Sequence, residues 1–245
     1  MVYGTVVTSA AVLAMLVYRY DMYEKEPWYL LLLALVLGMG TGWGAGSIED
    51  VLLATFDWYD NVAANAAVAA VVEELAKLLC VLLVALLFRG EFNDPIDGLI
   101  YGAFAGLGAA VIESLFYVSL EGDAIGLGGQ EIVRLLLHLT LGGLAGFGLG
   151  LARFRMPLWP IALLTSLTAA IALHFLWDYW IGLADQDVTP ASFLQFTSVG
   201  LMGVALALFG TAVLLGSRWS RDVIAPRSRK RLWGWPFSLW FRGRD

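Results

Sequence analysis

Two adjacent glutamates and a lysine interrupt a hydrophobic stretch that is long enough to cross a bilayer. The stretch covers residues 62–88, and Glu73, Glu74 and Lys77 are its only charged residues. Placing a charged side chain at the centre of a membrane costs about 2.5–3.5 kcal/mol even on translocon-insertion scales. Ionisable residues in such a position usually mark a functional site, and paired carboxylates beside an ammonium group suit proton transfer to and from water.

Four more polar residues lie inside other hydrophobic stretches: Glu113, His138, His174 and Asp178. The chain has only two histidines, and both belong to this set. A carboxylate can take a proton from water and pass it to a leaving amine. A neutral imidazole can donate a hydrogen bond to a developing oxyanion. We therefore interpret Glu73, Glu74, Lys77, Glu113, His138 and His174 as candidate catalytic residues for attack by water.

The depth of these residues in the membrane supports this interpretation. If successive stretches alternate in direction, Glu113, His138 and His174 each lie about seven or eight residues from the same membrane face, which is ~10–12 Å deep. Glu73 lies about eleven residues in, or ~16 Å. Agreement among four stretches favours one shared site. The simpler alternative is a set of interhelical hydrogen bonds with one buried ion pair.

A zinc ion is compatible with this set of residues, although the sequence does not require one. Two histidines and a carboxylate form a common catalytic ligand set, so Glu74, Glu113, His138 and His174 are candidate ligands. There is no His-Glu-x-x-His motif. Lys77 argues against a dication, because its ammonium group would compete for the glutamates. The position of both histidines at one depth tips the balance slightly toward a metal-dependent site.

The composition is that of a membrane protein built from helices. Hydrophobic residues make up 60% of the 245 residues, charged residues make up 15%, and the mean hydropathy is +0.76. Seven stretches are apolar enough to span a bilayer: 3–18, 28–48, 62–88, 96–120, 131–154, 158–183 and 193–217. The sequence predicts an all-α, polytopic helix bundle over residues 1–217, followed by a basic and aromatic tail over 218–245.

The distribution of basic residues predicts the orientation of the bundle. Thirteen of the 15 Lys and Arg residues fall on one side of the predicted stretches, eight of them in the tail. The opposite side is acidic and includes a predicted external loop over residues 49–61, with Arg134 as its only basic residue. By the positive-inside rule the N-terminus is expected outside and the C-terminus in the cytoplasm. The tail either lies on the anionic inner leaflet or only fixes the topology, and we favour the second interpretation.

Small residues recur every four positions and predict close helix packing. One stripe comprises Gly98, Gly102, Gly106 and Ala110, and a second comprises Gly142, Gly146 and Gly150. Such stripes let helix backbones approach closely. Glu113 nearly continues the first stripe, and the second begins one turn after His138. We therefore expect both residues to point into the bundle.

The remaining polar residues have structural explanations. Asp94 and Asp97 flank Pro95 at the start of the helix predicted over residues 96–120, where acidic residues and proline stabilise a helix start. Asp178 either orients His174 or lies at the membrane interface. Cys80 is the single cysteine, which excludes an internal disulfide, and we expect it to pack inertly. The segregated charges give no indication of a nucleic-acid partner.

Three segments of the sequence resemble the PrsW family of intramembrane proteases, relatives of the CAAX prenyl-endopeptidases. They are 73–77 (Glu-Glu-Leu-Ala-Lys), 94–103 (Asp-Pro-Ile-Asp-Gly-Leu-Ile-Tyr-Gly-Ala) and 106–117 (Gly-Leu-Gly-Ala-Ala-Val-Ile-Glu-Ser-Leu-Phe-Tyr). His138 and His174 follow in the order expected for the family, so the resemblance covers about residues 70–180. The chain departs from the family pattern around Glu113, with Ala109-Ala110 in place of Phe-Ala and Ser114 in place of Asn.

The resemblance implies an intramembrane endopeptidase in which Glu73 or Glu74 activates water. It also implies a membrane-protein substrate, cut near the outer face of the membrane, of which an anti-sigma factor is the typical example in the family. Two other function classes remain open at this stage. A non-catalytic scaffold occurs in the same superfamily, and intramembrane Glu, His and Lys also build the relays of proton- or ion-coupled transporters. We find no clear internal repeat of the kind that many transporters show.

Overall fold

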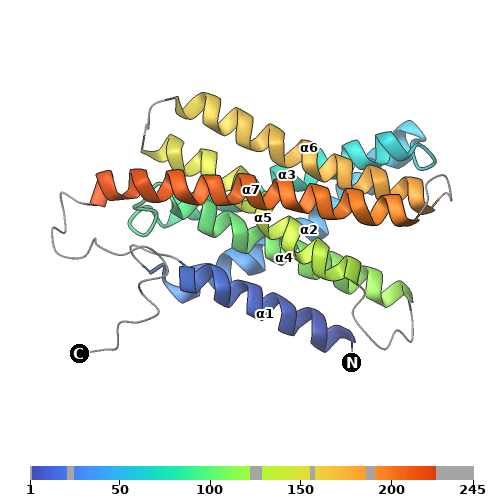
Figure 1. Cartoon of the computed structure of the whole chain (residues 1–245), viewed down its shortest axis with the longest axis horizontal. Coiled ribbons are helices and arrows are strands. Elements are labelled where there is room, and N and C mark those ends of the chain that lie inside the picture. The colour runs from blue at the N-terminus through green and yellow to red at the C-terminus, as the bar shows by residue number, and fades with distance from the viewer. Residues whose placement is uncertain (1, 21–24, 122–128, 155–157, 186–190, 225–245) are drawn as a thin grey trace.

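The computed structural model describes residues 2–20, 25–121, 129–154, 158–185 and 191–224. In this part of the chain the structure has seven helices and no strand, which confirms the predicted all-α bundle (Figure 1). The helices are α1 (Val2–Tyr20), α2 (Trp28–Phe56), α3 (Val62–Leu87), α4 (Asp97–Glu121), α5 (Gly129–Arg153), α6 (Trp159–Asp185) and α7 (Ala191–Ile224).

The length and composition of the helices are those of an integral membrane protein. Within the described residues, five helices are long and apolar enough to cross a bilayer, namely α2, α4, α5, α6 and α7. Helix α1 contributes a shorter apolar segment, Tyr3–Arg19. Helix α3 has 26 residues and holds Glu73, Glu74 and Lys77 near its middle. The charges of the candidate site therefore set α3 apart from the other long helices.

Two helices, α2 and α7, extend well beyond their predicted ends. Helix α2 continues to Phe56, so the first half of the predicted external loop over 49–61 is helical and Glu49 lies on the helix. It ends where Asp57 takes up the left-handed conformation, and Asn61 then caps α3 by accepting a hydrogen bond from the backbone N–H of Ala64 (3.1 Å). Helix α7 continues to Ile224. The rest of the predicted basic tail, residues 225–245, lies outside the described residues.

Glycines bring α4 against both of its main neighbours. A Cβ on Gly98 or Gly102 would run into the α5 backbone at Gly146 or Gly142, and one on Gly106 would run into the carbonyl group of His138. On the other side of α4, a Cβ on Gly108 would meet the backbone of α2. The predicted small-residue stripes therefore form the α4–α5 contact. That contact fixes the height of His138, by which we mean its position along the bundle axis relative to α4.

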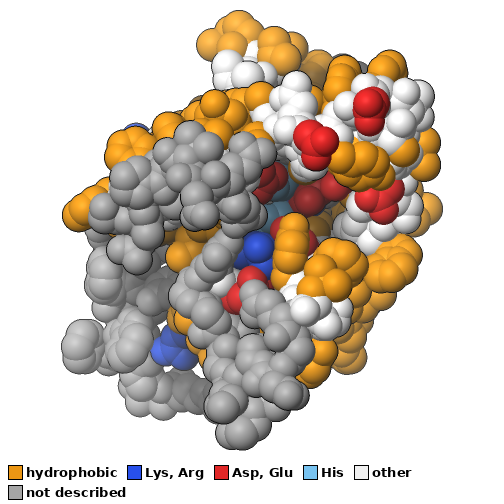
Figure 2. Space-filling model, turned by 90° about the vertical axis from the view of Figure 1, so that its right-hand side faces the viewer, with side chains coloured by type: hydrophobic (Ala, Val, Ile, Leu, Met, Phe, Trp, Pro, Cys, Tyr) orange, Lys and Arg blue, Asp and Glu red, His pale blue; other side chains and the backbone are white. Residues whose placement is uncertain are grey.

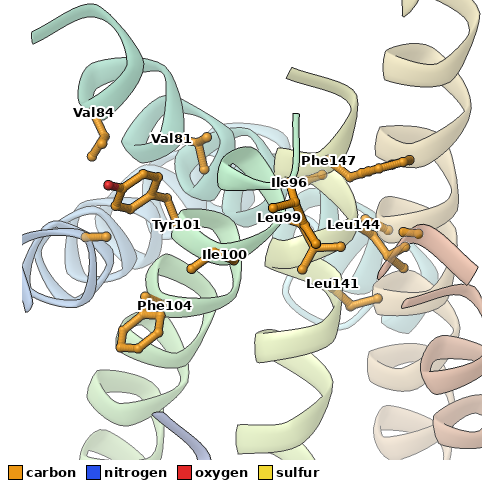
Figure 3. Packing of buried hydrophobic residues seen from close by; sticks show 14 of the residues in the cluster. Val81, Val84, Ile96, Leu99, Ile100, Tyr101, Phe104, Leu141, Leu144 and Phe147 are labelled. Atoms are coloured by element: carbon orange, nitrogen blue, oxygen red, sulfur yellow. The ribbon is translucent and has the colours of Figure 1, made fainter. Parts of the chain in front are cut away.

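Apolar side chains fill the space around α4. Figure 3 shows Ile96, just before α4, and Leu99 of α4 beside Leu141, Leu144 and Phe147 of α5, and Tyr101 beside Val81 and Val84 of α3. All of these side chains are buried. Helix α4 is thus the central element of the bundle, and the functional groups on α3, α4 and α5 are held by a packed interior.

A second polar cluster lies where α4 begins, and we call it the α4-start cluster: Glu26, Asp94, Asp97, Tyr101 and Ser220. Its side chains are all buried. Asp97 Oδ2 accepts hydrogen bonds from the backbone N–H groups of Asn93 and Asp94, each at 2.7 Å, and Asp94 Oδ1 accepts from the N–H of Ile96 at 3.0 Å. The hydroxyls of Ser220 and Tyr101 donate to Asp94 and Glu26. These contacts confirm the predicted helix-start role of the two aspartates.

Candidate active site

The candidate residues of α3, α4, α5 and α6 meet at the end of the bundle where α4 and α6 end and α3 and α5 begin. Figure 2 shows histidine and acidic surface at the bottom of a hollow on this end of the molecule. We call the group the reaction cluster: Glu73, Glu74, Lys77, Glu113, His138, His174 and Asp178. The cluster is joined by direct contacts, and both histidines and Lys77 are at most 1% exposed.

Glu73 is at the centre of the reaction cluster. Its Oε2 lies 3.5 Å from Lys77 Nζ, 3.5 Å from His138 Nδ1 and 4.0 Å from His174 Nε2. The side chain is 14% exposed, whereas that of Glu74 is fully buried. Adjacent residues on a helix point about 100° apart, which explains why Glu73 reaches both histidines and stays partly exposed whereas Glu74 is fully buried.

Glu74 binds the groups behind Glu73. Its Oε1 accepts a hydrogen bond from Lys77 Nζ at 2.6 Å and contacts His174 Nδ1 at 2.9 Å. The second ring nitrogen of His174 lies 3.2 Å from Asp178 Oδ2. Both ring nitrogens of His174 face a carboxylate, but the contact of Nδ1 with Glu74 is shorter (2.9 Å against 3.2 Å) and has hydrogen-bond geometry, so the proton of a neutral ring is favoured on Nδ1 and the lone pair on Nε2.

Glu113 lies beside His138 as Glu74 lies beside His174. Its Oε2 lies 3.1 Å from His138 Nε2, although the ring is not aligned for a hydrogen bond. Its Oε1 lies 3.2 Å from Arg134 Nε, and Arg134 in turn contacts Glu131. His138 Nδ1 has no hydrogen-bond partner among the described residues and faces Glu73.

Two contributors to this region were not predicted from the sequence as site residues. The sequence shows Arg134 only as the single basic residue of the acidic side, whereas in the structure it is 5% exposed and bound to Glu113. Glu49 was assigned to a loop, but it lies on α2 close enough to Glu73, His174 and Asp178 to interact with them electrostatically. A longer predicted α2 would have carried Glu49 to the depth of the site. For Arg134, a signal was its position one turn before His138.

The arrangement fits a bound metal ion. One ligand atom each from Glu73, His138 and His174 lie within 4.8 Å of one another. Tetrahedral zinc with bonds of about 2.0–2.1 Å needs ligand atoms roughly 3.3–3.5 Å apart, so small side-chain adjustments suffice. The donor chemistry also fits, because His138 Nδ1 is unpartnered among the described residues and His174 Nε2 faces two carboxylates. This donor set is compatible with a bound cation, and the Lys77 ammonium group already supplies one positive charge beside it.

The predicted metal ligands differ from the set that the structure gathers. Glu74 and Glu113 are candidate ligands by sequence, but each contacts the ring nitrogen on the far side from Glu73. Glu74 contacts Nδ1 of His174, and Glu113 contacts Nε2 of His138. Such a carboxylate typically orients a metal-binding histidine from behind. Glu73, rather than the predicted Glu74, lies within reach of both histidines. The two histidines remain in the set as predicted.

Comparison with known proteins gives one consistent family. The chain matches the PrsW family intramembrane metalloproteases over residues 26–213. It is 30% identical over 175 residues to Protease PrsW of Bacillus subtilis (strain 168), with 68% of this chain and 77% of the relative covered. It is 28% identical over 175 residues to Protease PrsW of Geobacillus kaustophilus (strain HTA426), with coverages of 71% and 76%. No solved structure matches the chain.

The matched region contains every residue of the reaction cluster and runs from the start of α2 into α7. The resemblance seen in the three sequence motifs is thereby confirmed over most of the bundle. The scaffold and transporter alternatives lose their support, because the relatives are proteases. With its membrane-spanning helices and its convergent glutamates and histidines, the chain belongs to the PrsW family of intramembrane metalloproteases.

Proposed function

We propose that this protein hydrolyses a peptide bond of a membrane-protein substrate next to Glu73, by a metal-dependent reaction. The observation that carries the proposal is the contact of one carboxylate oxygen, Glu73 Oε2, with both histidines and Lys77 inside a helix bundle. A single-span protein of the anti-sigma-factor type is the substrate that the family resemblance suggests.

Glu73, His138 and His174 would hold the metal, for which we propose zinc. Zinc bound in this way would polarise the scissile carbonyl group and lower the pKa of a bound water. Glu74 and Glu113 would each face the outer nitrogen of one histidine and so fix which nitrogen carries the proton. Lys77 balances the charge of the glutamate pair, because its ammonium group touches both carboxylates.

Proton transfer would fall to Glu73, whose side chain is 14% exposed. Its contacts to histidine and lysine are made through Oε2, and Oε1 would accept a proton from water and then pass it to the leaving amine, so that the proton ends on the product. The Asp178 carboxylate, which is 27% exposed, would orient His174 from beside Nε2. Fully buried Glu74 is a positioning residue in this scheme.

A metal-free reaction is the second candidate, and one observation favours it. Lys77 Nζ lies 3.5 Å from Glu73 Oε2 and already supplies a cation to the carboxylate. In that case Glu73 would act on water alone and a histidine would stabilise the oxyanion. The metal-dependent and metal-free reactions use the same residues. They differ in whether a metal ion lies between Glu73, His138 and His174.

The orientation of the protein also remains a proposal, with the N-terminus outside and the C-terminus in the cytoplasm. Arg134 is the one basic residue predicted on the outer side, and its charge is compensated by Glu113 and Glu131. It therefore opposes the positive-inside rule less than a free charge would. Cysteine substitutions in the tail should stay unlabelled by an impermeant reagent in intact cells, and ready labelling would reverse the assignment.

Purified protein in proteoliposomes with a single-span substrate tests the reaction itself. We expect cleavage that is lost on chelation and restored by zinc, with bound zinc measured on the same sample. Full cleavage at sub-stoichiometric metal would select the metal-free reaction. Cleavage by the Glu73→Gln protein at the wild-type rate would rule out both.

A further inference from the structure

The geometry points to Arg134 as a positioning residue of the active site. It fixes the carboxylate of Glu113 and, through it, the ring of His138, so that the lone pair on Nδ1 faces Glu73. This inference rests on the proposed function and adds a residue that lies outside the group of candidate catalytic residues.

The guanidinium group of Arg134 is held on three sides. Its Nε lies 3.2 Å from Glu113 Oε1, its Nη1 contacts Glu131, and its Cζ lies 4.4 Å from the centroid of the Tyr117 ring. Glu113 and Tyr117 are one turn apart on α4, whereas Glu131 and Arg134 are on α5. A planar cation with contacts in several directions has little freedom to rotate. Arg134 can therefore act as a fixed support for Glu113.

Glu113 has one oxygen for Arg134 and the other for His138. Oε1 pairs with the guanidinium group, and Oε2 lies 3.1 Å from His138 Nε2. A neutral imidazole has one N–H, and both ring nitrogens of His138 face a carboxylate. Glu113 is the nearer one, at 3.1 Å from Nε2 against 3.5 Å for Glu73 at Nδ1, so its charge favours the proton on Nε2 and the lone pair on Nδ1. Nδ1 is the atom that lies 3.5 Å from Glu73 Oε2. The lone pair of His138 Nδ1 is thus directed toward Glu73 by a chain of contacts that begins at Arg134 and passes through Glu113.

A purely structural role does not explain this placement. Helices α4 and α5 are already held together by the close backbone contacts at Gly98, Gly102 and Gly106. The ion pair between Arg134 and Glu113 is not needed to bring the two helices together. A buried ion pair is often no more stabilising than well-packed apolar residues. The contact with Glu113, which itself contacts His138, gives the arginine a role at the site.

The first test is kinetic, with a control on the same helix. We expect Arg134→Gln to lower kcat by about 10–100-fold, the effect typical of residues that orient a metal-binding histidine, with KM changed by less than about twofold. Arg134→Lys keeps the charge but lacks the planar group, and should restore part of the loss. Arg153→Gln makes the same change at the exposed far end of α5 and should leave kcat unchanged.

The second test needs neither substrate nor metal. With only two histidines in the chain, ring-nitrogen NMR of protein labelled with ¹⁵N-histidine gives two imidazoles, which His174→Gln assigns. At one pH, about two units above the ordinary histidine pKa of about 6.5, we expect wild-type His138 to carry its proton on Nε2 alone. Arg134→Gln should give a mixture of both tautomers, while the Arg153→Gln protein keeps the wild-type pattern.

The outcomes separate this inference from the proposed function. A wild-type protein that cleaves no substrate would count against the proposed function, and the tautomer of His138 would still decide the role of Arg134. A wild-type tautomer together with wild-type kcat in Arg134→Gln would overturn the inference. If Arg134→Gln does not fold, the same result in Arg134→Lys would overturn it, because lysine cannot bridge Glu113 and Glu131 as a planar group.

Discussion

The bundle buries two groups of acidic residues, and they differ in what binds them. In the α4-start cluster the aspartate oxygens accept hydrogen bonds from backbone N–H groups and a serine hydroxyl, and Tyr101 binds Glu26. In the reaction cluster the partners of Glu73, Glu74 and Glu113 are side chains that carry or can carry a charge. Backbone donors are fixed and cannot give up a proton, whereas Lys and His can change position or protonation state. The first arrangement stabilises a helix start, and the second can do chemistry.

The reaction cluster also holds buried polar atoms that have no hydrogen-bond partner among the described residues. They include one oxygen of Glu74 and the Nδ1 atom of His138. Buried polar atoms without partners are costly and are retained mainly where function requires them. Substitutions should therefore separate the clusters, with loss of activity at one and loss of stability at the other.

The largest effect is expected at Glu73. Glu73→Gln should lower kcat by about 10²–10⁴-fold, the range associated with loss of general acid–base catalysis, because the amide can neither take a proton nor bind a metal as a carboxylate. The midpoint of thermal unfolding should change little, since the side chain is partly exposed and its contact with Lys77 is 3.5 Å long. A variant that unfolds at a much lower temperature would place Glu73 with the structural residues instead.

Glu74 should combine both kinds of loss. Removing one partner of a buried ion pair typically destabilises a protein by about 3–5 kcal/mol, and Glu74 is the 2.6 Å partner of buried Lys77. Glu74→Gln should thus lower the unfolding midpoint as well as kcat, unlike Glu73→Gln. The double variant Glu74→Gln/Lys77→Met should regain stability without regaining activity. Recovery of cleavage in the double variant would contradict the positioning role of Glu74.

At the α4-start cluster the expected loss is one of stability. Asp97→Ala removes a carboxylate oxygen that accepts from two backbone N–H groups, and an unmatched buried donor costs about 1–3 kcal/mol. The rate per folded molecule should stay within about twofold of wild type, because these residues lie at the start of α4 and the reaction cluster near its end. A hundredfold loss of kcat in a fully folded Asp97→Ala protein would show that the α4-start cluster also takes part in the reaction.

Much of this comparison could be predicted from the sequence, for definable reasons. Glu73, Glu74 and Lys77 stand out because hydrocarbon makes charge expensive, and the helix-start role of Asp94 and Asp97 follows from their place beside Pro95. Side-chain direction could not be predicted. The sequence left Glu73 and Glu74 equivalent, and only the packing of α3 against α5 and α6 turns Glu73 toward both histidines. Arg134 could not be predicted as a site residue, because an arginine near the start of a helix is expected to be exposed. Its partner Glu113 on α4 is evident only from the structure.

The glycine contacts connect the two clusters and give a smaller effect on both. Gly106→Ala puts a methyl group against the carbonyl group of His138, and overpacking of this kind costs typically about 1–3 kcal/mol. Displacement of α5 should also move His138 and lower kcat. Gly210→Ala on α7 is the matched control, because a Cβ there meets nothing within 4 Å. Equal behaviour of the two variants in unfolding and cleavage would show that the α4–α5 contact does not set the height of His138.

The smallest effect is expected at Ser114, directly after Glu113, where the chain departs from the family pattern. Its hydroxyl oxygen is buried and has no hydrogen-bond partner among the described residues. Removing an unpartnered buried polar group does not break a hydrogen bond and relieves its desolvation penalty. Ser114→Ala should therefore leave kcat unchanged and keep or slightly raise the unfolding midpoint. Glu113 is held by Arg134 and His138 without help from its neighbour. A clear loss of activity in Ser114→Ala would instead show that the serine hydroxyl supports Glu113 during the reaction, and that the support of this glutamate extends along α4 as well as across to α5.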